Sequence, residues 1–278
     1  MGIYTLGKQS REAHFQENKH TKLLKQMHTF ITGQSFRCLK VPDYELDEEN
    51  MSPGMGLMTS RISQFCSDIA EVLQTLQNNS KEPEQELKIL QEQLQHAMVL
   101  QRRIESWYNS LSPIWKPSRI TAADGKVLFT FKTRLLGLLW PLYYAVLSFF
   151  YIAVFSCCQS ILSLQDSAAG GKEASITITT SRMARHNILQ LIDSICSSIP
   201  YNLGEVDEKG QIIPGLASKA SSAYYLIWPL ALVVKSRHST DVQSSTCSKT
   251  LQRIRIMYGI ELVGTAMSVI EKKCRWLG

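Results

Sequence analysis

Apolar residues recur at steps of three and four positions along most of the chain, which is the spacing of one face of an amphipathic α-helix. One such stretch covers residues 57–76 and ends at Asn78-Asn79-Ser80. Ser80 is then the expected N-cap of a second helix, which covers 87–111 and is closed by Pro113 and Pro117. The pattern therefore predicts a pair of long amphipathic helices in this part of the chain.

Three further stretches, near 175–198, 216–235 and 246–273, predict helices as well. The apolar stripe of the first consists of Met183, Ile188, Leu191, Ile192 and Ile195. The alternation typical of a strand is limited to residues 176–179. A linker near 166–174 precedes these helices, and residues 1–55 are weakly patterned, as expected of a partly disordered leader. We predict an all-α fold, a single large helical domain of about six or more helices over 56–278.

The run LLGLLWPLYYAVLSFFYIAVFSCC, residues 135–158, carries no charge and has two interpretations. It exceeds the roughly 20 residues that cross a bilayer, and Lys132 and Arg134 before it would keep its N-terminal side in the cytosol. Alternatively, it is a buried helix that begins near Trp140, with Pro141 in its first turn. The shorter run 221–234 repeats the Trp-Pro-Leu sequence. We therefore favour two apolar helices that share one core, and keep a single-pass membrane anchor as the alternative.

Charge and cysteine content narrow the class of protein. The net charge of +6 is modest for a dedicated DNA-binding domain. The seven cysteines are scattered and form no CxxC pair, which favours buried thiols in a reducing compartment over a disulfide scaffold. The N-terminal residues lack the apolar core of a secretory signal. The expected location is therefore the nucleus or the cytoplasm.

Patterns of catalytic residues are missing from the sequence. It has no P-loop, no GxGxxG spacing, no HExxH zinc motif and no GxSxG nucleophile elbow. His186 has no second histidine one turn away, and Asp207-Glu208 lie in a polar loop that is typical of solvated charges. We predict a protein that is not an enzyme and has no catalytic residues, metal or cofactor. A biosynthetic enzyme is kept as a weaker hypothesis.

Three short motifs follow one another in the C-terminal part of the chain. A helix that carries Cys196 ends in Pro200-Tyr201-Asn202-Leu203-Gly204, and an apolar helix with Trp228-Pro229-Leu230 comes next. A helix with Arg253 and Arg255 then continues through Gly259-Ile260. In this order and spacing the motifs resemble the C-terminal regulatory halves of fungal binuclear zinc-cluster transcription factors, especially regulators of secondary-metabolite genes. Residues 57–165 are similar to that family in pattern only.

The resemblance implies an α-helical regulatory domain. Its motif residues also have a structural interpretation. Residues 200–204 would form a helix-terminating turn in which Gly204 takes a positive φ, and Trp228 and Pro229 would lie in a core helix with a kink. These residues are Pro200, Tyr201, Leu203, Gly204, Trp228, Pro229 and Gly259.

The DNA-binding element of that family, six cysteines that hold two zinc ions, has no counterpart here, since Cys38 is the first cysteine and Cys66 the next. Specific DNA binding by the family's route is therefore not available to this chain. We expect a transcription regulator of the kind found with fungal secondary-metabolite gene clusters. It would act in the nucleus or cytoplasm through protein partners or a small-molecule effector, and would contact a membrane only if residues 135–158 insert.

Overall fold

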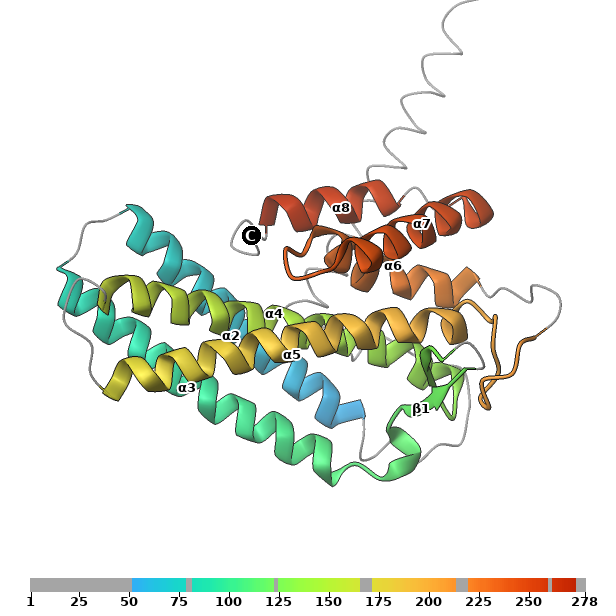
Figure 1. Ribbon diagram of the computed structural model, residues 1–278, viewed down its shortest axis with the longest axis horizontal. Helices are drawn as coiled ribbons and strands as arrows, with labels where there is room; N and C mark the ends of the chain where they lie inside the picture. Colours follow the sequence, from blue (N-terminus) through green and yellow to red (C-terminus); the bar gives the residue numbers. More distant parts are fainter. Residues whose placement is uncertain are drawn as a thin grey trace, which may run out of the picture. The chain divides into compact units, whose positions relative to one another are not determined.

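The computed structural model describes residues 52–78, 82–122, 125–165, 172–213, 220–259 and 262–273. Over these residues the chain forms seven α-helices, one 3-10 helix and a sheet of two short strands (Figure 1). This arrangement confirms the predicted all-α fold. Residues 1–51 of the predicted leader, residues 166–171 of the predicted linker and the expected N-cap Ser80 lie outside the described residues, whereas residues 52–55 and 172–174 are helical.

Contacts within the chain divide it into two units, Met1–Gln64 and Phe65–Gly278. Helix α2 (Ser52–Asn78) crosses this boundary, and its first half is the described part of the first unit. In that half the apolar residues Met55, Met58 and Ile62 keep the helical spacing of three and four.

The second unit contains the end of α2 and all later elements. In chain order these are α3 (Pro83–Ser110), η2 (Pro113–Trp115), β1 (Ser118–Thr121), β2 (Val127–Thr130), α4 (Arg134–Gln165), α5 (Lys172–Asn202), α6 (Ala220–Lys235), α7 (Asp241–Tyr258) and α8 (Leu262–Lys273). Helix α3 has Glu82 at its N-cap and Pro83 in its first turn, so its N-cap lies two residues after Ser80, the cap that the sequence suggested.

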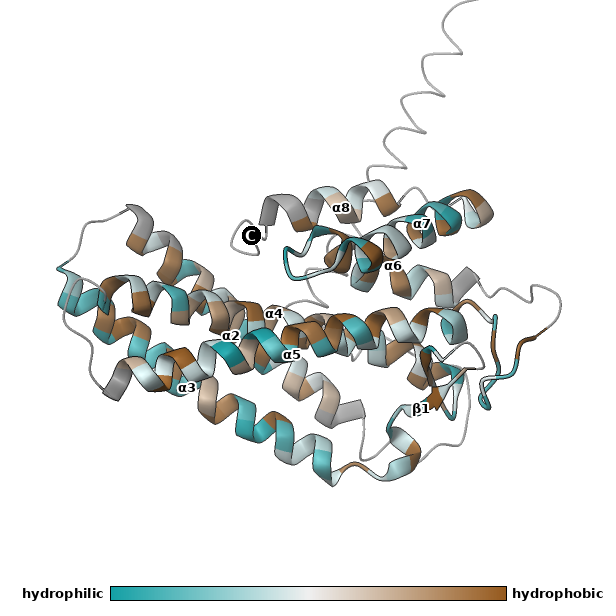
Figure 2. Ribbon diagram, viewed as in Figure 1, coloured by the Kyte–Doolittle hydropathy of each residue, from teal (hydrophilic) through white to brown (hydrophobic). Residues whose placement is uncertain are grey.

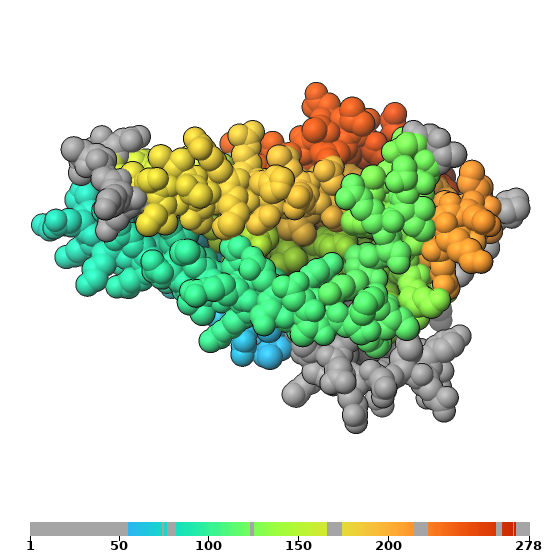
Figure 3. Space-filling model, turned by 60° about the horizontal axis from the view of Figure 1, so that its bottom comes forward, coloured from blue at the N-terminus to red at the C-terminus, as the bar shows by residue number. Residues whose placement is uncertain are grey.

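Helix α4 is central to the second unit, because it packs against α3, α5 and α6. Every side chain from Leu139 to Ser148 is buried, so burial extends around the whole circumference of the helix. In the view of Figure 3, α4 shows only as a strip between α3 and α5. Both of these neighbours alternate between polar and apolar residues along their length (Figure 2). Their apolar faces therefore pack against α4.

The same helix meets the length and composition of a membrane span. Among the described residues, α4 is the only helix that is long and apolar enough to cross a bilayer, and 61% of its most apolar window is buried inside the structure. The central helix of a folded domain passes the same test, since a helix that neighbours cover on all sides is apolar on all sides.

The start of α4 differs from the prediction. The helix begins at Arg134 rather than near Trp140, so Pro141 lies inside the helix and not in its first turn. Thr133 explains the early start: its Oγ1 accepts a hydrogen bond from the Leu136 N–H at 3.4 Å, as an N-cap does. Pro141 has no N–H to donate to the carbonyl of Gly137, and its ring crowds that carbonyl.

The segment 176–179, the one strand candidate of the sequence, lies in helix α5, which agrees with the helix predicted near 175–198. A threonine of this segment is compatible with a helix because its hydroxyl bonds to the preceding turn: Thr179 Oγ1 donates to the carbonyl of Ser175 at 2.9 Å. In the predicted stripe of α5, Ile188, Ile192 and Ile195 are buried, whereas Met183 remains 36% exposed and Leu191 is partly exposed.

The strands that do form are β1 and β2, which pair antiparallel with Ser118 opposite Thr130. Gly125 turns the chain between them, with φ +80°. The last predicted helix is also two helices, because Gly259 ends α7 in the left-handed region, with φ +62°.

Candidate binding groove

The Pro-Tyr-x-Leu-Gly motif forms the C-terminal cap of α5. Gly204 has φ +73°, its N–H donates to the carbonyl of Tyr201 at 3.0 Å, and the N–H of Glu205 donates to the carbonyl of Pro200 at 2.9 Å. These two bonds and the left-handed residue define a Schellman motif. Pro200 lies inside the last turn, which continues to Asn202, and Leu203 is buried beneath the cap.

The cap also joins α5 to the start of α4. The ring of Tyr201 packs at 5.3 Å from the ring of Phe131, which precedes α4. On its other side it lies so close to Gly137 that a Cβ there would stand 2.7 Å from Tyr201 Cε1. Glycine at position 137 is therefore what allows α4 and the end of α5 to approach closely.

The loop that follows the cap is tied to the hairpin. Asp207 Oδ1 accepts hydrogen bonds from the N–H groups of Lys209 and Gln211 at 2.8 and 2.9 Å. Thr130 Oγ1 donates to the carbonyl of Glu208 at 2.9 Å. Asp207 thus closes a turn, and Glu208 forms an exposed ion pair with Lys132 at 3.7 Å.

The other motif residues lie apart from this cap in the sequence and in separate elements. Trp228 is partly exposed and Pro229 is buried, both within α6, and Gly259 is the exposed C-cap of α7. The structure brings Pro200, Tyr201, Leu203 and Gly204 together in one turn.

A groove of about 980 Å³ opens between the hairpin, the C-terminal half of α5 and α7. Its apolar lining comes from Val127, Leu128 and Phe129 of the hairpin and from Ile199 and Leu203 at the end of α5. Pro200 also lines it, and it leaves the carbonyl of Cys196 without the helical N–H that another residue would donate. The space-filling view shows the hairpin against the end of α5 (Figure 3).

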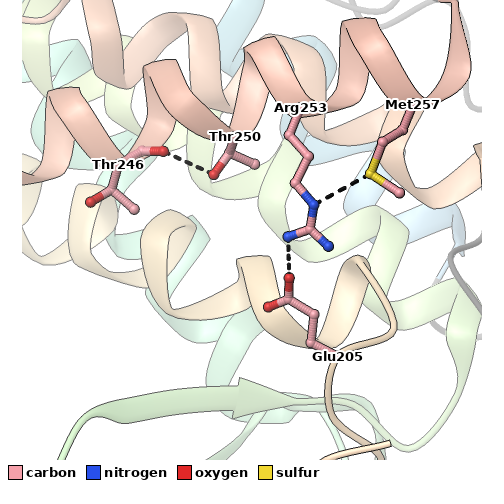
Figure 4. Close-up of polar contacts among 5 residues, drawn as sticks. All are labelled: Glu205, Thr246, Thr250, Arg253 and Met257. Carbon is pink, nitrogen blue, oxygen red and sulfur yellow. Dashed lines mark hydrogen bonds and ion pairs between the residues drawn. The ribbon is translucent and has the colours of Figure 1, made fainter. Parts of the chain in front are cut away.

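Charged residues surround this apolar lining. Arg119 and Lys126 come from the hairpin, Arg253 from α7, Asp193 from α5 and Glu205 from the loop after it. Arg253 forms an ion pair with Glu205 and also donates from Nε to Met257 Sδ at 3.4 Å (Figure 4). This pair is partly exposed, so it contributes little to stability but holds the guanidinium in place.

Helix α7 is fixed at its start by a capping box. Thr240 Oγ1 accepts from the Gln243 N–H, and the Gln243 side chain accepts in return from the Thr240 N–H. Gln243 Nε2 also donates to Asp193 Oδ1 at 2.6 Å, which joins α7 to α5. Further along α7, Thr250 Oγ1 donates to the carbonyl of Thr246 (Figure 4). The groove wall is therefore formed by two helices that are bonded to each other.

Two thiols meet in that wall. The Sγ atoms of Cys196 on α5 and Cys247 on α7 lie 3.7 Å apart. The Cys247 thiol lowers the pKa of Cys196, since it donates a hydrogen bond to the Cys196 thiolate, and that same bond and burial raise the pKa of Cys247. By contrast, burial raises the pKa of Cys157 and of Cys158 to about 12. The sequence predicted buried thiols but gave no sign of this pair, whose members are 51 positions apart.

The described residues contain no group of three or more histidine, cysteine, aspartate or glutamate side chains that could hold a metal ion. His186 is exposed on α5.

Burial raises the pKa of Tyr151 to about 12, and raises that of Tyr143 further, so both phenols stay protonated near neutral pH. The arrangement thus offers an apolar surface with a charged border, which is suited to binding.

Comparisons of this chain with models of protein families, with curated proteins and with solved structures found no match.

Proposed function

We propose that this chain is a transcription regulator of the kind found with fungal secondary-metabolite genes, and that it responds to a small molecule bound in the groove beside α5 and α7. The groove is the observation that carries this proposal. Its volume of about 980 Å³ lies within the range of small-molecule sites. The motif resemblance from Ile195 onward supports the regulatory role, because its Pro200–Gly204 turn forms part of the groove border.

The lining defines the chemistry of the ligand. Phe129 and Ile199 offer apolar contact, and Arg119 places an exposed cation on the hairpin side. The two acidic groups of the groove are already engaged, Asp193 by Gln243 and Glu205 by Arg253. The expected effector therefore has an apolar body and an anionic group.

Binding is tested with 8-anilinonaphthalene-1-sulfonate, which has an aromatic body and a sulfonate. The full chain should bind it saturably, with a rise in fluorescence. Ser197→Trp fills the groove, because Ser197 lines it, and should weaken binding by about tenfold or more, the cost of about 1.4 kcal/mol. Ser175→Trp places the same side chain on an exposed position of α5 outside the groove and is the matched control. Equal binding by both variants, each with the circular dichroism of the wild type, would refute a site in the groove.

The regulatory role is tested separately. The full chain is fused to an unrelated DNA-binding domain, and transcription is measured from a reporter that carries the binding sites of that domain. The fusion should change transcription relative to the domain alone. Ser197→Trp should alter this change and Ser175→Trp should leave it intact, since only the first residue lines the groove. A fusion that leaves transcription at the level of the domain alone contradicts the proposed role.

A membrane anchor is the second candidate, favoured by the length and apolarity of α4. Alkaline carbonate extraction separates the two proposals. A regulator with α4 as its central helix should be released into the supernatant, whereas a chain anchored by α4 should stay in the membrane pellet.

A further inference from the structure

Helices α5 and α7 bring two cysteines into contact at the border of the groove. Cys196 is partly exposed and lines the groove, whereas Cys247 is fully buried. Their sulfur atoms are 3.7 Å apart, so a further approach of about 1.7 Å reaches the disulfide bond length of about 2.05 Å. The Asp193–Gln243 hydrogen bond, one turn earlier on both helices, holds the two backbones in this position.

We propose that Cys196 and Cys247 are a redox-active pair, in which a hydroperoxide reaches Cys196 from the groove and Cys247 completes an intramolecular disulfide between α5 and α7. Formation of this bond does not require that the groove binds an effector. A protein that fails to bind the sulfonate probe can still form the disulfide, and a protein that binds the probe can still fail to form it.

The reaction takes two steps. The Cys196 thiolate attacks one oxygen of hydrogen peroxide, an S–O bond forms, the O–O bond breaks, and the released hydroxide takes a proton to become water. The Cys247 thiolate then attacks the sulfur of the Cys196 sulfenic acid, the S–S bond forms, and the S–O oxygen leaves as a second water. The two thiols lose two electrons and two protons, and the peroxide is reduced to water.

The surroundings assign the two roles. Cys196 has access to the groove and receives the hydrogen bond of the Cys247 thiol, which favours its thiolate over the opposing effects of burial and of the Asp193 carboxylate. Cys247 is buried and has a raised pKa, so it is a poor first nucleophile and suits the resolving role. A low-pKa, accessible thiol next to a second thiol is the typical arrangement of a redox sensor.

The buried pair Cys157 and Cys158 is the internal comparison. Burial raises the pKa of both thiols to about 12, so little thiolate is present at neutral pH. Cys196 lines the groove and its pKa is lowered, so it should react with peroxide faster than the buried Cys157 or Cys158.

The test uses the reduced full chain. It is treated with a small excess of hydrogen peroxide, the remaining thiols are blocked with N-ethylmaleimide, and the digest is mapped by mass spectrometry. The expected product is a linked peptide pair that joins Cys196 to Cys247, lighter by two hydrogens, which dithiothreitol returns to two thiols. Recovery of both cysteines as maleimide adducts, or linkage of either to a different cysteine, overturns the proposal.

Two variants test the order of events. In Cys247→Ser the reaction should stop at the sulfenic acid of Cys196, which dimedone traps, and in Cys196→Ser the thiol of Cys247 should stay reduced. Cys158→Ser is the control and should leave the disulfide unchanged. Dimedone labelling of Cys247 in the second variant at the rate seen for Cys196 in the first reverses the assigned roles. The wild-type map decides the outcome even where a variant folds poorly.

Discussion

The contact between Gly137 and Tyr201 gives the sharpest test of how α4 and α5 pack. A Cβ at position 137 would lie 2.7 Å from Tyr201 Cε1, 3.1 Å from its Cδ1 and 3.2 Å from Asn202 Oδ1. The tyrosine ring has little room to withdraw, since Phe131 packs against it at 5.3 Å. Asn202 is likewise held by its hydrogen bond to the carbonyl of Ser198 at 3.0 Å.

Two opposing effects set the magnitude for Gly137→Ala. Alanine gains about 1 kcal/mol over glycine inside a helix, and overpacking costs about 1–3 kcal/mol. We expect a net loss of about 1 kcal/mol in the free energy of unfolding. In the Tyr201→Ala background the ring is gone, so the same substitution should gain up to about 1 kcal/mol. The coupling between the two positions is then about 2 kcal/mol.

Urea unfolding of the wild type, both single variants and the double variant, followed by far-ultraviolet circular dichroism, measures this coupling. Gly264→Ala in α8 is the matched control, because a Cβ there meets nothing within 4 Å. It should gain about 1 kcal/mol whether or not Tyr201 is present. A Gly137→Ala effect that is the same in both tyrosine backgrounds would refute the close contact of α4 with the α5 cap.

Other predictions concern the caps, a histidine and the disulfide. Gly204→Ala places a Cβ at φ +73° and should lower the free energy of unfolding in urea by about 1–2 kcal/mol. Gly204→Asn should lower it by less, and equal losses in the two variants would contradict a left-handed cap. Thr240→Ala removes the α7 capping box and should cost about 1 kcal/mol, while Thr240→Ser retains most of the stability; a neutral alanine variant refutes the box. Burial, aided by the Arg185 charge, lowers the pKa of His238 below its ordinary 6.5. The unfolded chain thus binds the proton more readily than the folded chain. The free energy of unfolding should therefore keep its full value above pH 6.5 and decrease as the pH drops below it. His238→Phe should flatten the pH dependence of urea midpoints in that range, and an unchanged slope excludes this histidine as the cause. The Cys196–Cys247 disulfide joins residues that are 51 positions apart and should add up to about 4 kcal/mol to the free energy of unfolding. Calorimetry should show this as a higher Tm of the oxidised form that dithiothreitol reverses. An oxidised form with a lower Tm would show that the bond strains the helices.

The helices could be predicted wherever one face is buried along a long stretch. Ile188, Ile192 and Ile195 of α5 recur at helical spacing and all three are buried. The strands were missed because four residues are too few to show alternation, and β2 has partly exposed residues on both faces. Residues 176–179 show a strand-like alternation because β-branched residues are common in strands, but they fall within the stretch 175–198 whose spacing predicts a helix, and they lie one turn after the start of α5.

The candidate site separates into a local part and a tertiary part. The cap at Pro200–Gly204 is built from adjacent residues, so a sequence can point to it. The groove draws on three segments, the hairpin, α5 and α7, and the distance of 3.7 Å between Cys196 and Cys247 depends on how two helices pack. Scattered cysteines look alike in a sequence, because what distinguishes them is the neighbour that each one meets in the fold.

The apolar run of α4 shows the same dependence on neighbours. Read alone, its cations Lys132 and Arg134 resemble the positive flank of a membrane span. In the structure, Lys132 pairs with Glu208 at 3.7 Å, and Arg134 Nε donates to Ser222 Oγ of α6 at 3.2 Å. Both cations thus contact polar groups of the same unit, and the residues from Leu139 to Ser148 are buried in a helix that packs against α3, α5 and α6. A helix that neighbours cover on every side is apolar on every side, so the run fits the central helix of a folded unit as well as a membrane span.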